Sequence, residues 1–120
     1  MKSLKILLYV IAVYLIFIGS LYMLFPNFAE SILQITLSDR STAMVHGFGN
    51  LVMAFLAITI AGNLEKYNHM VRVFQVFAIG EAIIFGYQIL SGMHTFAEVG
   101  PPLVIWGVLS VLLVLFDRKK

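Results

Sequence analysis

Four long apolar stretches run through the chain and are separated by short polar segments. They cover approximately residues 4–25, 41–61, 70–90 and 103–116. A helix of about 20 apolar residues is long enough to cross a hydrocarbon core roughly 30 Å thick. The fourth stretch is short, so we expect that helix to begin with the prolines before it and to stand nearly upright. The pattern predicts an all-α fold, an integral membrane bundle of four transmembrane helices in one domain.

A short additional helix is expected between the first and second spans. Pro26 ends the first span, because proline cannot extend a helix. Asn27, with Glu30 three positions later, is typical of a helix N-terminus. Over residues 28–37 the apolar side chains face one way and the polar ones another. That pattern is typical of a helix that lies in the membrane interface.

The first apolar stretch is interpreted as a transmembrane helix and not as a secretory signal peptide. Its apolar run, residues 6–25, is longer than the roughly 7 to 15 residues of a signal-peptide core. No pair of small residues follows it in the spacing that signal peptidase cleaves. We therefore expect this segment to remain in the protein as its first span.

Composition narrows the possible chemistry. The 120 residues are 61% hydrophobic and 12% charged, which is too little polar surface for a soluble domain of this size. There is no cysteine, so disulfides and thiolate metal sites are excluded. His94 and Glu98 have only one plausible metal-ligand spacing, and we expect no metal site there. No basic face with interleaved aromatic residues is present, so we expect no nucleic-acid partner.

The distribution of positive charge predicts the orientation of the chain. Arg40 is the one basic residue expected on its side of the membrane. The other seven lie on the opposite side: Lys2, Lys5, Lys66, Arg72, Arg118, Lys119 and Lys120. Cytoplasmic loops collect Lys and Arg, so both termini are expected in the cytoplasm. The expected location is the inner (plasma) membrane of the cell, which the chain crosses several times.

A few polar residues fall inside the predicted spans. Glu81 lies about ten residues into the third span, near the bilayer midplane, where an ionised carboxylate costs several kcal/mol. Gln88 shares a stripe with Glu81, and His46 and Asn50 are one turn apart on the second span. Antiparallel packing of spans two and three would bring these four residues together, and Tyr14 reaches the same level. The similar depths of these polar residues in the membrane therefore predict a polar pocket between spans two and three.

Two interpretations of this pocket remain open. In the functional one, Glu81 exchanges a proton or holds a cationic or hydroxylated ligand, and His46 tunes or relays the proton. In the structural one, the side chains hydrogen-bond one another with Glu81 protonated, and they fix the helix register. For Asn50 and Gln88 the structural interpretation is favoured.

A seam of small residues on the third span predicts close helix packing. Ala78, Ala82 and Gly86 recur every four residues. Small side chains at this spacing let a second helix approach the backbone closely. The seam fits a protein that packs against other membrane helices, in a larger complex or in a homo-oligomer.

The chain resembles the DoxX-like family of small four-helix membrane proteins. The residues that carry the resemblance are Gly19, the closing residues 24–26 of the first span, the segment 46–50, Glu81 and the charged end 117–120. The resemblance implies an accessory subunit of quinone-linked sulfur oxidation, or a factor that helps other membrane proteins mature. No catalytic motif of the family matches residue by residue, so no active site carries over.

These observations favour an accessory or scaffolding subunit of a larger membrane complex. The sequence requires no cofactor, and a quinone or a lipid is the ligand class that the predicted pocket would suit. One alternative is a small proton-coupled transporter that uses Glu81. Another is an intramembrane enzyme acting on a lipid or isoprenoid, with Glu81 and His46 as acid and base. A single acid and base without a metal or nucleophile favours a protein that is not an enzyme.

Overall fold

A computed structural model describes residues 2–25, 27–28, 40–93 and 95–118, and the elements in these ranges are all helical. Four of them are long: α1 (Lys2–Leu24), α3 (Arg40–Gly62), α5 (Val71–Leu90) and α6 (Phe96–Arg118). Two short elements, α4 (Leu64–Tyr67) and η1 (Asn68–Met70), connect α3 to α5. The predicted all-α class is confirmed for this part of the chain. The four predicted spans correspond to four helices that are long and apolar enough to cross a membrane.

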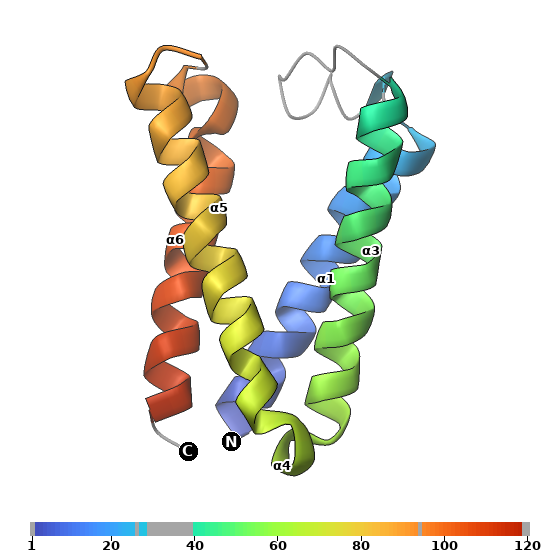
Figure 1. Ribbon diagram of the computed structural model, residues 1–120, viewed down its shortest axis with the longest axis vertical. Helices are drawn as coiled ribbons and strands as arrows, with labels where there is room; N and C mark the ends of the chain where they lie inside the picture. Colours follow the sequence, from blue (N-terminus) through green and yellow to red (C-terminus); the bar gives the residue numbers. More distant parts are fainter. Residues whose placement is uncertain (1, 26, 29–39, 94, 119–120) are drawn as a thin grey trace.

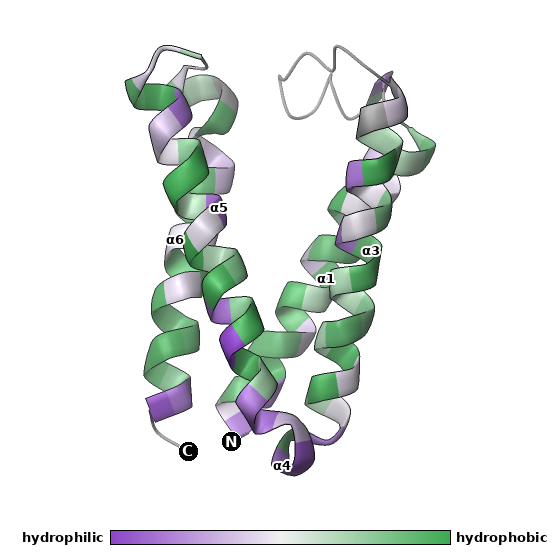
Figure 2. Ribbon diagram, viewed as in Figure 1, coloured by the Kyte–Doolittle hydropathy of each residue, from purple (hydrophilic) through white to green (hydrophobic). Residues whose placement is uncertain are grey.

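Apolar residues surround the long helices instead of forming one stripe. Figure 2 shows hydrophobic residues along most of their length, with hydrophilic residues in α4 and near the ends of the chain and as separate bands on α3 and α5. Large side chains such as Val13, Phe55 and Val76 are more than half exposed. Helices that are hydrophobic on all sides are typical of an apolar environment, because water would not solvate the outer face.

The long helices are arranged as two pairs. α1 lies along α3, and α5 lies along α6. We call these pairs the first and the second hairpin. Both chain termini and α4 lie at one end of the molecule, where the hairpins meet, and toward the opposite end the hairpins diverge (Figure 1). We call these two ends the joined end and the open end.

The main hydrophobic core lies toward the joined end and draws on all four long helices. Its fully buried large side chains are Leu4, Leu8, Ile11, Leu15, Ile60, Val71, Phe74 and Leu113. A second, smaller cluster of Leu21, Tyr22 and Ala43 belongs to the first hairpin alone. The distribution of buried side chains therefore follows the shape of the molecule, with a shared core at the joined end and separate packing toward the open end.

The first hairpin is built on a direct contact between two glycines. A Cβ atom added to Gly47 would lie 2.6 Å from the carbonyl oxygen of Gly19, and one added to Gly19 would lie 2.7 Å from that of Gly47. Real Cβ atoms do not approach carbonyl oxygens so closely, so neither position accepts a side chain without a shift of the backbone. By contrast, Gly86 of the predicted seam has nothing within 4 Å, although Ala78 is buried. The closest helix approach thus lies at Gly19 and Gly47.

The second and third spans do not pack along each other as the sequence analysis expected. α3 packs along α1, and α5 packs along α6. The connection explains the difference, because residues 64–70 fold into α4 and η1 instead of a tight antiparallel turn. The Asn63 side chain accepts a hydrogen bond from the backbone N–H of Lys66 at 3.3 Å and so caps α4.

The fourth long helix begins earlier than expected. It starts at Phe96 and contains Pro101 and Pro102, whereas the sequence pattern predicts a start near residue 103. Prolines have no backbone N–H, so the carbonyl groups of Ala97 and Glu98 receive no helical hydrogen bond from them. Pro101 and Pro102 therefore lie inside the helix, where each removes a backbone hydrogen bond and favours a local kink.

The interfacial helix predicted over residues 28–37 falls almost entirely outside the described residues. Asn27 and Phe28 are helical. Residues 29–37 lie outside the described ranges, so this prediction stays untested.

Substitution of two glycines of α3, Gly47 and Gly49, tests the close contact in the first hairpin. Gly47→Ala is expected to lower the free energy of unfolding by about 1–3 kcal/mol, because the new methyl group meets the Gly19 carbonyl. Gly49→Ala is the matched control, since a Cβ there meets nothing within 4 Å, and it should be neutral or stabilising by up to about 1 kcal/mol. Unfolding of the purified variants in detergent measures both effects. Equal stability of the two variants would contradict the contact.

Candidate functional site

The two hairpins meet at a cluster of three aromatic rings. The buried Trp106 ring of α6 lies edge-on to Tyr14 of α1, with 5.6 Å between ring centroids and 79° between planes. It also lies edge-on to Phe77 of α5, at 5.2 Å and 81°. Edge-to-face pairs of this kind contribute about 0.5–1.5 kcal/mol each beyond the area they bury. Trp106 therefore contacts both its own hairpin and the other one.

Glu81 lies next to this aromatic contact, on the side toward the open end. It follows Phe77 by four residues on α5, so the two side chains share a face of the helix. Glu81 is half-buried, and His46 of α3 and Tyr14 and Tyr22 of α1 lie within the range over which charge on one residue affects the others. We call these four residues the Glu81 cluster. Its members come from three helices and from both hairpins.

The first hairpin contributes an edge-to-face aromatic pair to the Glu81 cluster. Tyr22 and His46 lie edge-on, with 5.2 Å between ring centroids and 81° between planes. Tyr22 is buried, and His46 is exposed. The aromatic contact positions the imidazole ring of His46 on the α1 side of α3 and limits its orientation.

Asn50 has a different environment from the Glu81 cluster. It is 7% exposed and packs at the crossing of α1 and α3, where a Cβ on Gly19 would lie 3.2 Å from the Asn50 Cβ. This position agrees with the structural role that the sequence analysis favoured for it. Asn50 therefore belongs to the packing of the first hairpin.

Gln88 is half-buried on α5, two turns beyond Glu81. Its backbone carbonyl accepts a hydrogen bond from the Ser91 hydroxyl at 3.4 Å. No side-chain hydrogen bond joins Gln88 to His46, Asn50 or Glu81 among the described residues, and the convergence of these four side chains stays a prediction.

The Glu81 cluster offers one carboxyl group, one imidazole and two phenol groups in a largely apolar setting. No side-chain hydrogen bond joins them within the described part of the chain, in contrast to the second hairpin near the joined end. There Gln75 donates to Asp117 at 3.2 Å and to the Leu113 carbonyl at 3.4 Å, so side-chain hydrogen bonds join α5 to α6. The carboxyl of Glu81 remains able to accept or donate a hydrogen bond, or to exchange a proton, with a molecule between the hairpins.

The sequence analysis missed Tyr22 and Trp106. Tyr22 follows Tyr14 by about two helical turns, which is a weak signal that both belong to one site. Trp106 is the sole tryptophan of the chain and lies near the centre of its span, away from the interfaces where tryptophan is usual in membrane proteins. That unusual depth could have identified Trp106 as a candidate site residue from the sequence.

Metal binding receives no support from the described residues. They contain no group of three or more His, Asp and Glu side chains that could hold a metal ion. His94 and the Glu98 side chain, the pair considered in the sequence analysis, lie outside what the structure describes.

Comparison with known proteins identifies no family for this chain. No family model matches the sequence, and neither a curated protein nor a solved structure matches it. The resemblance to the DoxX-like family therefore stays a prediction from the residues quoted above.

The role of Trp106 in joining the hairpins can be measured as a distance. The chain has no cysteine, so spin labels can be attached at Met44→Cys and Met93→Cys, one exposed position on each hairpin near the open end. Trp106→Ala should lower stability by about 3–5 kcal/mol and broaden the distance distribution between the labels. The control Leu115→Ala, at an exposed position on the same helix, should leave the distribution unchanged. The same width in all three proteins would contradict this role.

Proposed function

We propose that this chain is a membrane protein that crosses the bilayer four times with both termini in the cytoplasm. Four helices of sufficient length and apolar character support the crossings. The basic residues support the orientation, because Lys2, Lys5, Lys66, Arg72 and Arg118 all lie at the joined end. Arg40 begins α3 at the other end. Since positive charge collects in the cytoplasm, the joined end faces inward in the cell's inner membrane.

Within the membrane, the protein is an accessory or scaffolding subunit of a larger complex. The described chain is almost entirely four long helices, and the connection between α3 and α5 is only α4 and η1. Large exposed apolar side chains on α5, among them Val76, Ile83 and Leu90, are available to partner helices as well as to lipid. This arrangement suits a protein that acts through contacts inside the bilayer.

The Glu81 cluster receives the polar group of a quinone-like or lipid-like molecule. The observation that carries this proposal is Glu81 itself, a half-buried carboxyl group in the middle of an apolar helix. Polar residues at such depth are costly and usually mark a substrate, ion or proton pathway. A hydroxyl or carbonyl group between the hairpins would bond to the Glu81 carboxyl, while the aromatic rings of Tyr14 and Phe77 would contact an apolar tail.

A proton-coupled transporter is the second candidate, and one observation favours it. His46, the residue whose charge affects Glu81, belongs to the other hairpin. A proton moving between these residues would alter the attraction between the two hairpins toward the open end. This would link protonation to the spacing of the hairpins.

Single cysteines test the orientation. His69→Cys lies near the joined end and Met93→Cys near the open end, both at exposed positions in a chain without cysteine. A membrane-impermeant maleimide applied to intact cells should label Met93→Cys strongly and label His69→Cys only after the membrane is permeabilised. The reverse pattern would mean that the chain is inserted upside down, and equal labelling of both would contradict a fixed orientation.

Purification in mild detergent tests the functional proposal. A larger membrane protein and a lipid-soluble small molecule should co-purify with the tagged chain, and mass spectrometry would identify both. Glu81→Gln should reduce the amount of small molecule by about tenfold, as expected when a hydrogen bond to a charged group is weakened. The control Tyr87→Phe changes a polar group that is 64% exposed on the same helix and should leave both unchanged.

The outcomes separate the candidates. If a partner protein co-purifies regardless of Glu81 and no small molecule is bound, the scaffolding role is supported and the proposed ligand binding at Glu81 is contradicted. A chain that purifies alone, and that drives proton-coupled uptake in vesicles only when Glu81 is intact, would replace this proposal with the transporter.

A further inference from the structure

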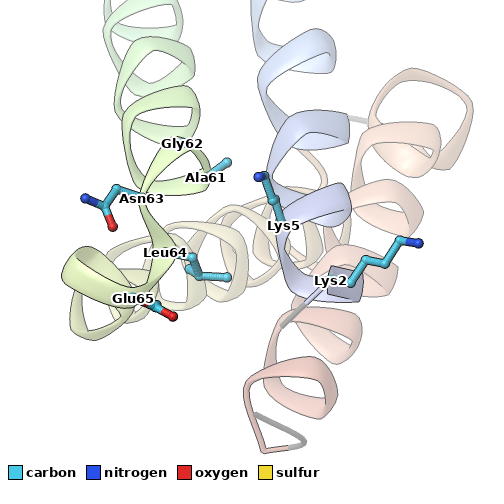
Figure 3. Close-up of a pocket in the computed structure, with 7 residues that line it drawn as sticks. All are labelled: Lys2, Lys5, Ala61, Gly62, Asn63, Leu64 and Glu65. Carbon is cyan, nitrogen blue, oxygen red and sulfur yellow. The ribbon is translucent and has the colours of Figure 1, made fainter.

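A hollow of about 460 Å³ lies at the joined end, between the start of α1 and the turn from α3 into α4. Figure 3 shows Lys2 and Lys5 on α1, and Leu64 and Glu65 projecting from the α4 side toward that helix. Ala61 and Asn63 also line it. Its volume lies within the range of about 300–1,000 Å³ that is usual for small-molecule sites. The hollow is separate from the Glu81 cluster.

The charges around this hollow are opposite on its two sides. Two ammonium groups, those of Lys2 and Lys5, come from α1, and one carboxylate, that of Glu65, comes from α4. All three side chains are exposed, and no ion pair or hydrogen bond to their charged groups occurs among the described residues. The lining therefore has a positive side and a negative side that do not neutralise each other directly.

We infer that this hollow binds the headgroup of a zwitterionic phospholipid with a primary amine, of the phosphatidylethanolamine type. The lipid phosphate interacts with Lys2 and Lys5, and the lipid ammonium interacts with Glu65. Ala61 and Leu64 contact the beginning of the acyl chains. The inference rests on the proposed membrane crossing, which puts the joined end at the level of the lipid headgroups.

The chemistry of the lining selects this headgroup over two common alternatives. A choline headgroup carries the same charges, but its quaternary nitrogen has no N–H to donate to the Glu65 carboxylate. An anionic glycerol headgroup would satisfy the lysines and leave Glu65 facing added negative charge. A primary ammonium beside a phosphate is the arrangement that satisfies both sides of the hollow.

The test uses the full-length protein in nanodiscs that contain equal amounts of phosphatidylethanolamine, phosphatidylcholine and phosphatidylglycerol. Co-elution with the discs establishes insertion, and native mass spectrometry then counts the lipids that remain bound. The wild-type chain should retain phosphatidylethanolamine over phosphatidylcholine by about fivefold, the size expected for exposed ion pairs.

Two charge-removing variants should change lipid retention in different ways. Glu65→Gln leaves the hollow positive, so bound phosphatidylglycerol should rise about fivefold relative to phosphatidylethanolamine. Lys5→Gln should reduce retention of both lipids. Lys66→Gln is the matched control, because Lys66 follows Glu65 directly but does not line the hollow; its ammonium lies 5.3 Å from the centre of the Tyr67 ring.

If the three lipids are retained by the protein in the same proportions as they occur in the nanodisc, the proposed headgroup site is wrong. The proposed membrane crossing would be unaffected by this result. An equal effect of Lys66→Gln and Lys5→Gln would also overturn the headgroup site, because attraction to the whole basic end would then explain the binding. A chain that does not co-elute with the discs would overturn both the site and the proposed membrane crossing.

Discussion

The contact of the Trp106 indole ring with both hairpins determines the geometry of the candidate site. Trp106 fixes Tyr14 of α1 against the second hairpin, and its contact with Phe77 fixes the height of α5 at the same level. Glu81 lies one turn beyond Phe77, where the hairpins begin to diverge. The aromatic contact thus lies on one side of the carboxyl group, toward the joined end, and Glu81 itself is half-buried.

The helices could be predicted from the sequence, because long apolar runs leave few alternatives to transmembrane helices. The similar height of Glu81 and Tyr14 along their helices could also be expected from the sequence, because the rise per residue of a helix is constant. Helix pairing could not be predicted in the same way. These helices are apolar on all sides, so no hydrophobic stripe indicates which face meets which neighbour. The pairing depends on shape, above all on the contact between Gly19 and Gly47, and glycines elsewhere in α3 face open space.

The polar groups of the described chain fall into two kinds. Gln75 and Asp117 bond to each other and hold α5 to α6, and Asn50 is enclosed at the α1–α3 crossing. Glu81 makes no such bond, and its electrostatic neighbours belong to the other hairpin. A residue that only fixed helix packing would be expected to resemble the first kind. This contrast could not be drawn from the sequence, because it depends on which helices are neighbours.

Because the two hairpins are joined at one end, a rotation of one hairpin relative to the other displaces the open end most. α5 has 20 residues and is therefore about 30 Å long. A rotation of about 10° at the joined end moves the far end of such an arm by about 5 Å, roughly the width of one acyl chain. Residues at the joined end hardly move during that rotation, whereas residues further along the arm, Trp106 near the middle of α6 among them, move in proportion to their distance from the pivot. Small changes in packing at the joined end are thereby amplified toward the open end.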